Sequence, residues 1–116
     1  MHTFRRFLPL SALTLALVLS GCGGSPTSRR QIAVVAGSGG AAFEPTTVTV
    51  NKDDNVVLTV RNPTVSAHGF SVEGYGIQTE IPPGEAEVKI KATHPGTFKV
   101  YCQLHETHKI ATLVVQ

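Results

Sequence analysis

A thiol and two imidazoles lie within seven consecutive residues near the C-terminus. Cys102, His105 and His108 fall in the segment Tyr-Cys-Gln-Leu-His-Glu-Thr-His, which begins at Tyr101. Thiolate and imidazole are ligands that copper and zinc accept, and one cysteine with two histidines in a trigonal arrangement is typical of copper electron-transfer sites. The segment therefore predicts a metal site to which Cys102 and His105 contribute two ligands.

The third ligand must come from elsewhere in the chain, and His68 is the best placed. It follows the turn-forming Asn62-Pro63-Thr64 and opens a predicted strand, so a sandwich of strands could bring it beside Cys102. Taken singly, His68 is as well explained as a core histidine, and Cys102 as a small buried hydrophobic residue. Taken together in a chain made of strands, they favour metal binding.

Zinc with three protein ligands and an open position is the alternative metal site. Catalytic zinc works with a nearby base, and no acidic residue in this sequence has a placement that would provide one. The sequence also has no Gly-rich phosphate loop and no Ser/His/Asp set. We therefore expect a protein that is not an enzyme.

The N-terminal segment predicts export and lipidation. Arg5 and Arg6 precede an apolar run, Phe7–Leu19, which has the length of a signal peptide and is short for a membrane span. The run ends in Leu19-Ser20-Gly21-Cys22, which resembles the lipobox of bacterial lipoproteins, where cleavage precedes a cysteine that is then acylated. We expect residues 1–21 to be the signal peptide and Cys22 the lipid anchor. An ordinary secretory signal with a chance cysteine is the alternative.

Loss of this signal changes the charge balance. The whole chain has ten Lys and Arg against eight Asp and Glu, and the two basic residues Arg5 and Arg6 leave with the signal, so eight of each sign remain. A clustered basic face for nucleic acid is not implied. We expect the protein on the cell membrane or outer membrane, facing the periplasm or exterior. Gly23, in place of the Asp that favours inner-membrane retention, slightly favours the outer membrane.

The lipid anchor leaves Cys102 as the one free thiol in an oxidising compartment. Such a thiol is exposed to oxidation unless it is buried or used in chemistry. The cysteine count thus makes Cys102, independently of spacing, the residue whose presence must be explained by burial or by chemistry.

The remaining 95 of the 116 residues predict one small all-β domain. Residues 22–31 are polar after the lipidated cysteine and predict a flexible tether, and residues 32–116 form the expected domain. No stretch after the signal has helical spacing, and seven or eight short strands indicate an antiparallel β-sandwich. The strands are expected at Ile32–Val35, Thr46–Val50, Val56–Val60, His68–Val72, Gly76–Ile81, Glu87–Ala92, Thr97–Cys102 and Thr112–Val115.

Several segments resemble the cupredoxins, in the order in which that family has them. The resemblance covers nearly all of Ile32–Gln116 and implies a Greek-key β-sandwich or barrel that binds one copper ion, cycling between Cu(I) and Cu(II), through His68, Cys102 and His105. The segments are Phe43-Glu44-Pro45, Val48-Thr49-Val50, Asp53-Asp54, Val56, His68–Gly74, Ile81–Glu85, Pro95–Phe98 and Tyr101-Cys102 with the His105 loop.

Within that family, the His68 and Ile81–Glu85 segments look most like the copper domain of cytochrome c oxidase subunit II and nitrous-oxide reductase. The binuclear centre of that group uses two cysteines in one loop, whereas this loop has only Cys102. The resemblance therefore implies a mononuclear, type 1-like site with a Cys-x-x-His loop.

The axial methionine of type 1 sites has no counterpart, because the only methionine is Met1, in the signal. His108 stands six residues after Cys102, where short-loop cupredoxins have that methionine. We expect His108 to be the fourth ligand. The alternative is a solvent-facing His108, with water, a backbone carbonyl or nothing in the axial position. Resemblance to nitrosocyanin, which has a carboxylate ligand, adds Glu73 and Glu106 as outside candidates.

The resemblance implies an electron carrier that docks transiently with redox protein partners near His105. Leu104 and Ile110 are the expected apolar contacts, and the protein is expected to be a monomer that binds no nucleic acid. The alternative is a copper chaperone or scavenger that supplies a copper oxidase or reductase. Copper carriers usually have Met-rich or open sites, and the absence of methionine after the signal favours electron transfer. A metal-free interaction module is a third reading.

Overall fold

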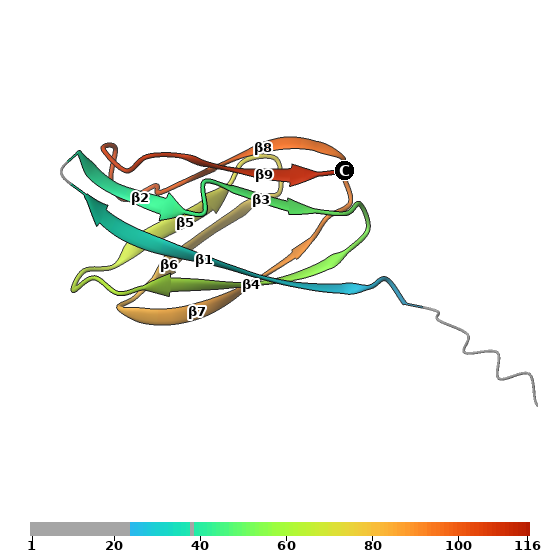
Figure 1. Ribbon diagram of the computed structural model, residues 1–116, viewed down its shortest axis with the longest axis horizontal. Coiled ribbons are helices and arrows are strands. Elements are labelled where there is room, and N and C mark those ends of the chain that lie inside the picture. The colour runs from blue at the N-terminus through green and yellow to red at the C-terminus, as the bar shows by residue number, and fades with distance from the viewer. Residues whose placement is uncertain (1–23, 38) are drawn as a thin grey trace, which may run out of the picture.

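The computed structural model describes residues 24–37 and 39–116, which form nine strands (Figure 1). The predicted signal peptide, residues 1–21, and the predicted acylation site, Cys22, lie outside the described residues. In the described ranges, no helix is long and apolar enough to cross a membrane. The strands are β1 (Thr27–Gly37), β2 (Gly40–Glu44), β3 (Thr47–Val50), β4 (Asn55–Asn62), β5 (His68–Val72), β6 (Ile77–Ile81), β7 (Gly84–Lys91), β8 (Gly96–Tyr101) and β9 (Ala111–Val115).

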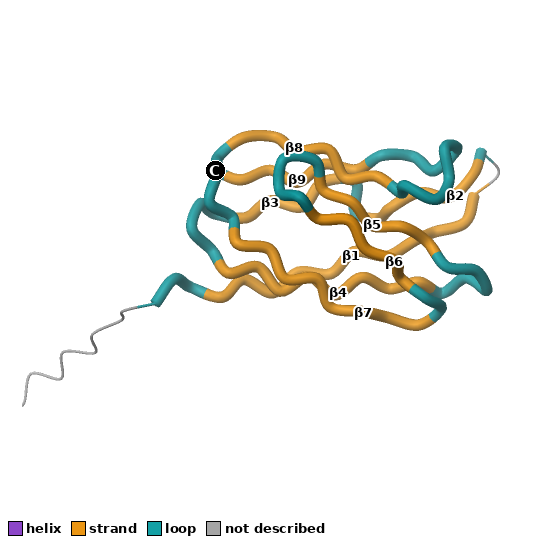
Figure 2. Tube along the Cα trace, turned by 180° about the vertical axis from the view of Figure 1, so that it is seen from behind, coloured by secondary structure: helices purple, strands orange, loops and turns teal. Residues whose placement is uncertain are grey.

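The strands form two sheets that pack face to face (Figures 1 and 2). One sheet has the order β2-β1-β4-β7, and the other has the order β3-β9-β8-β5-β6. The predicted all-β sandwich is confirmed. The expectation of purely antiparallel sheets is wrong, because β1 pairs with β4 and β3 pairs with β9 in parallel. Alternation of apolar residues shows which face of a strand is buried but carries no information about strand direction.

β1 begins inside the predicted tether. Thr27–Gln31 pairs with β4 in a register that starts at Thr27 opposite Asn55, so this part of the tether prediction is wrong. The Ser28 hydroxyl donates a 2.6 Å hydrogen bond to a carboxylate oxygen of Asp54, which fixes the start of the strand. Residues 27–31 of this strand show no hydrophobic pattern, because they pair through main-chain hydrogen bonds while most of their side chains face water.

β2 was also missed, since none of the eight predicted strands lies between Val35 and Thr46. The chain folds back at Gly37 and Gly40, which pair with each other, and the strand returns along β1. Gly40 has a φ of 107°, a left-handed conformation that a side chain disfavours.

The core lies between the two sheets. Along β4, buried residues alternate with more exposed ones, and the register places Val56 and Leu58 opposite Ile90 and Val88 of β7. β5 differs, because all five of its residues are buried. The largest fully buried hydrophobic side chains of the core are Phe43, Phe70, Ile32, Ile81, Val34, Val50, Val56, Val60 and Val72.

Candidate metal centre

Two neighbouring strands deliver the predicted ligands to one end of the sandwich. His68 is the first residue of β5, and Cys102 follows the last residue of β8. β5 and β8 pair antiparallel, with Ser71 opposite Tyr101, so the start of one strand lies beside the end of the other. His105 and His108 lie in the loop from 102 to 110, which joins β8 to β9 and which we call the ligand loop.

The structure brings all four predicted residues together. One ligand atom each from His68, Cys102 and His108 lie within 4.8 Å of one another, and all three residues are buried. His105 is exposed, with its Nδ1 3.4 Å from the sulfur of Cys102 and its ring centroid 4.9 Å from that of His68. An imidazole from mid-chain therefore reaches the buried thiol, which is the spatial arrangement that the sequence predicted.

Two buried imidazole nitrogens in this cluster have no hydrogen-bond partner in the described part of the chain. They are Nδ1 of His68 and Nε2 of His108. Buried polar atoms are nearly always paired, and an unpaired one calls for a specific explanation such as a missing ion. Nδ1 of His108 lies 3.0 Å from the Lys109 carbonyl, which can only accept, so Nδ1 carries the proton and Nε2 is left with its lone pair. These donors fit a copper ion.

Burial favours the uncharged form of two of these imidazoles. It lowers the pKa of His68 from the usual 6.5, and the nearby His105 and His108 lower it further. Burial also lowers the pKa of His108, against a smaller raising effect from the Lys109 carbonyl. A metal must compete with protons for histidine, so neutral imidazoles at neutral pH are ready to bind one.

The sulfur of Cys102 accepts a hydrogen bond from the backbone. The N–H of Gly69 donates to it over 3.1 Å, across 33 residues of sequence. Hydrogen bonds to a cysteine sulfur stabilise the thiolate and tune the potential of a metal bound to it. Sequence reasoning did not single out Gly69, although a glycine directly after a predicted ligand is the signal that could have found it.

Aromatic packing holds His108 inside the protein. Its ring lies 4.3 Å from that of Phe43, between centroids, and 5.5 Å from that of His68. Phe43 in turn meets Phe70 edge to face at 5.7 Å. The alternative reading of His108 as a solvent-facing loop residue is therefore wrong.

The missed β1–β2 hairpin supports the end of the ligand loop. The N–H of Lys109 donates to the Ala41 carbonyl over 2.8 Å. A Cβ built on Gly40 would lie 2.8 Å from the Thr107 carbonyl oxygen, which shows how closely the hairpin approaches the loop. The turn thus positions His108.

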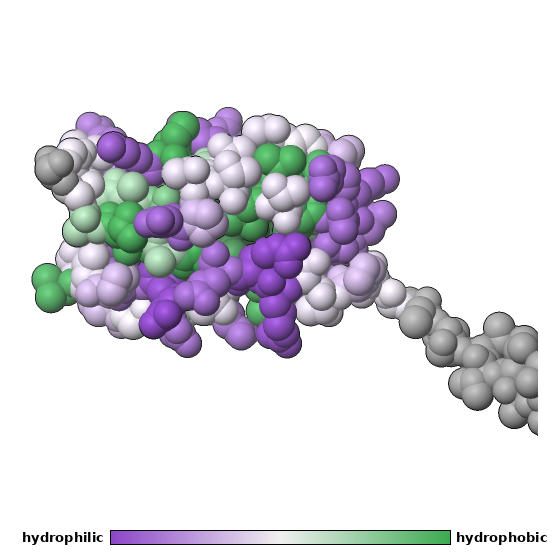
Figure 3. Space-filling view, viewed as in Figure 1, coloured by the Kyte–Doolittle hydropathy of each residue, from purple (hydrophilic) through white to green (hydrophobic). Residues whose placement is uncertain are grey.

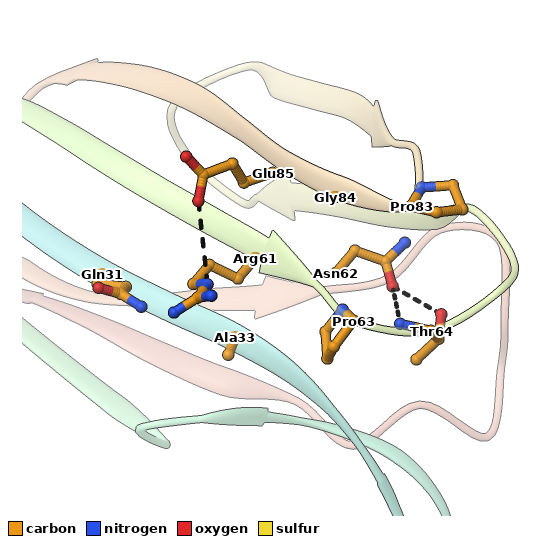
Figure 4. A pocket seen from close by; sticks show the side chains of 9 residues that line it. All are labelled: Gln31, Ala33, Arg61, Asn62, Pro63, Thr64, Pro83, Gly84 and Glu85. Carbon is orange, nitrogen blue, oxygen red and sulfur yellow. Dashed lines mark hydrogen bonds and ion pairs between the residues drawn. The ribbon is translucent and has the colours of Figure 1, made fainter.

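Asn62 organises the loop that leads to His68. Its side-chain amide donates to the carbonyls of Ser66 and Ile81 over 2.8 and 3.0 Å, and its side-chain oxygen accepts from the N–H and hydroxyl of Thr64 (Figure 4). Asn62 is fully buried. The sequence indicated a turn here but not that one amide holds it together.

Glu73 does not reach the cluster. It follows β5 at the end opposite His68, roughly 16 Å away along the strand. Glu106 lies in the ligand loop but is exposed and is outside the group of close ligand atoms in the described chain. Neither carboxylate is supported as a ligand.

A surface groove of about 590 Å³ lies on the β1–β4–β7 sheet and contains none of the four residues (Figure 4). Arg61 and Glu85 face each other across 3.9 Å, and both are well exposed, so solvent screens the pair. The remaining lining is Gln31, Ala33, Asn62, Pro63, Thr64, Pro83 and Gly84.

Residues 9–115 match the family described as the Cupredoxin-like domain. The chain belongs to this family. Cytochrome c oxidase subunit 2 of Thermus thermophilus is 32% identical in an alignment 79 residues long, which covers 64% of this chain and 58% of that protein. A second sequence of the same subunit matches over 46% of its length, so this chain spans about half the length of the curated relatives that it matches. The predicted cupredoxin resemblance is confirmed.

Solved cupredoxins have the same fold. Reduced auracyanin from Roseiflexus castenholzii superposes with a TM-score of 0.62 at 17% identity, covering 81% of this chain and 99% of that one. A purple cupredoxin from Nitrosopumilus maritimus gives 0.58 at 14% identity, covering 75% and 99%. Family membership and the His68–Cys102–His108 cluster together support a copper protein with one copper site.

Proposed function

We propose that the protein is a one-electron carrier with a mononuclear copper centre held by His68, Cys102 and His105, with His108 as the fourth ligand. The observation that carries this proposal is the pair of unpaired imidazole nitrogens beside the buried thiol. Cys102 is a free thiol, so it is available as a thiolate ligand. A binuclear centre would need a second cysteine that this loop lacks.

Copper, when bound, would supply a single-electron couple, Cu(II)/Cu(I). The protein's part is to keep the ligand atoms in one arrangement for both oxidation states. Two paired strands carry His68 and Cys102, and packing against Phe43 holds His108, so little rearrangement is expected. His108 as a ligand predicts a low potential, because imidazole is a stronger donor to Cu(II) than a distant thioether.

The surface around His105 suits transient docking. Val65, Leu104 and Ile110 are exposed by 99%, 47% and 58%, and they lie in the two loops that lead into β5 and β9. Figure 3 shows apolar side chains at the end of the sandwich where the β4–β5 loop lies. A small apolar surface beside an exposed imidazole would favour brief contact with a redox protein. We expect a monomer that is not an enzyme.

The proposed location is a membrane surface outside the cytoplasm, with acyl chains on Cys22 as the anchor. This rests on the order of charge, apolar run and lipobox in residues 1–22. Acyl chains in the bilayer give stable anchoring when more than one is present.

A copper titration of residues 23–116, which contain all nine strands, tests the proposal. We expect one copper per chain, a thiolate-to-copper absorption band that is lost in Cys102→Ser, and reversible voltammetry with fast electron exchange. Slow exchange together with prompt copper transfer to a metal-free partner would instead support a copper chaperone. Failure to bind copper, or a preference for zinc, would contradict both functions.

A further inference from the structure

The side chain of Gln103 bridges the ligand loop to two strands. Its Oε1 accepts a 2.7 Å hydrogen bond from the Ser71 hydroxyl of β5, and its Nε2 donates 2.8 Å to the Thr79 carbonyl of β6. Gln103 directly follows Cys102 in the chain. The amide therefore pins the main chain one residue beyond the sulfur.

The space for this amide exists because residue 69 is glycine. A Cβ on Gly69 would overlap Oε1 and Cδ of Gln103 and would lie 2.9 Å from its backbone nitrogen. Successive side chains of β5 point to opposite faces of the sheet. Phe70 and Val72 face the core, so Gly69 and Ser71 face away from it. Gln103 covers this outer side, which explains why all five residues of β5 are buried.

Gly69 also donates its N–H to the sulfur of Cys102. Both contacts occur at the same close approach of the ligand loop to β5, where Gln103 lies over Gly69 and the sulfur lies within 3.1 Å of the Gly69 N–H. Loss of the Gln103 amide would free the start of the ligand loop and lengthen this bond.

We propose that Gln103 is a positioning residue for the metal centre, whose side-chain amide clamps Cys102 against Gly69. The inference rests on the proposed function for its role at copper, but the clamp itself is a property of the protein without metal. It explains the Gln103–Ser71–Thr79 hydrogen bonds, to which neither the family match nor the ligand cluster assigns a role.

Thiol reactivity of the metal-free protein tests the clamp. The full chain is used with Cys22→Ser, so that Cys102 is its only thiol, and the rate of reaction with an aromatic disulfide reagent is measured. Gln103→Ala removes two hydrogen bonds, and we expect the rate to rise about tenfold. Gln78→Ala is the matched control, because Gln78 is an exposed glutamine paired with Ser71 on the neighbouring strand. The thiol of the Gln78→Ala protein should react at the same rate as that of the starting protein.

Two further variants keep the test decisive if Gln103→Ala fails to fold. Gln103→Glu keeps the acceptor for Ser71 but places an oxygen against the Thr79 carbonyl, so its rate should also rise. Ser71→Ala removes one of the two bonds, and we expect an increase of about threefold. Wild-type rates in these folded variants would overturn the proposal.

Copper spectra separate positioning from simple destabilisation. In the Gln103 variants we expect the thiolate-to-copper absorption band and the reduction potential to shift. Gly84→Ala should leave both unchanged, because it strains the backbone at a positive φ while the added Cβ would have no atom of another segment within 4 Å. An unshifted band in the Gln103 variants would also overturn the positioning role. If the starting protein binds no copper, the proposed function fails while the thiol rates still decide the clamp.

Discussion

The amide nitrogen of Asn62 donates a 3.0 Å hydrogen bond to the carbonyl of Ile81, across 19 residues of sequence. Ile81 is the residue opposite His68 in the β5–β6 pair. One buried side chain thus connects the end of β4, the loop that precedes His68 and the strand beside it.

Asn62→Ala should lower the free energy of unfolding by about 2–4 kcal/mol, because it removes the four hydrogen bonds of a buried side chain and leaves the buried Ile81 carbonyl without this partner. Denaturant unfolding of the metal-free protein measures this loss. Asn55→Ala is the matched control, since Asn55 is exposed and its side chain makes, among the described residues, a single long hydrogen bond of 3.3 Å to the Ser25 carbonyl. Its expected cost is within about 0.5 kcal/mol. Equal costs for the two variants would contradict the role of Asn62.

Gly40 and Gly84 form a second matched pair. Both have left-handed φ values, 107° and 115°, but only Gly40 lies against another segment, the Thr107 carbonyl. Each Gly→Ala change should cost about 1–3 kcal/mol of backbone strain. Gly40→Ala should in addition displace the ligand loop and change the copper spectrum, which Gly84→Ala should not. Thermal unfolding and optical titration measure the two effects, and identical spectra would argue against hairpin support of His108.

The metal-free protein should lose stability in mild acid. The pKa values of His68 and His108 are lowered in the folded state, so below the usual 6.5 the unfolded chain binds more protons than the folded one. The contribution of these two histidines to the free energy of unfolding is therefore complete above pH 6.5, and it declines as the pH falls below that value. Unfolding free energies across this range measure it, and His108→Gln should flatten the slope. An unchanged slope would contradict the protonation argument.

His108→Met should raise the copper reduction potential and move the absorption towards that of a blue type 1 site, because a thioether is a weaker donor to Cu(II) than imidazole. Voltammetry and visible spectra give both quantities. His94→Met is the control, since His94 is exposed in the β7–β8 turn. A blue spectrum before mutation, unchanged in His108→Ala, would rule out His108 as a ligand.

The sequence predicted the sandwich, the family and the four residues of the cluster, because strand patterns and metal ligands both depend on the types and spacing of side chains. Five of the eight predicted strands lie within one residue of the observed strand at both ends, including His68–Val72 and Thr97–Cys102. Positions that depend on the main chain were not found. Thr27–Gln31 joins a sheet through backbone hydrogen bonds, and its polar side chains resemble those of a tether.

The contacts around the ligands were hidden for a related reason. Gly69 acts through its N–H and through the side chain that it lacks, and Gln103 acts through partners 24 and 32 residues away. Neither leaves a periodic or compositional signal. Glu73 was an outside candidate because of the resemblance to nitrosocyanin, but the length of β5 separates it from the cluster.

The early start of β1 affects the distance between the membrane surface and the end of the sandwich that contains the ligand loop. β1 runs for eleven residues, about 36 Å, from Thr27 to the hairpin that touches the ligand loop. If Cys22 is acylated, only four residues separate the anchor from this stiff strand, enough to span at most about 14 Å. The domain would then stay close to the membrane, and the end that contains the ligand loop would lie away from the lipid. That end would be open to partners that approach from the aqueous side.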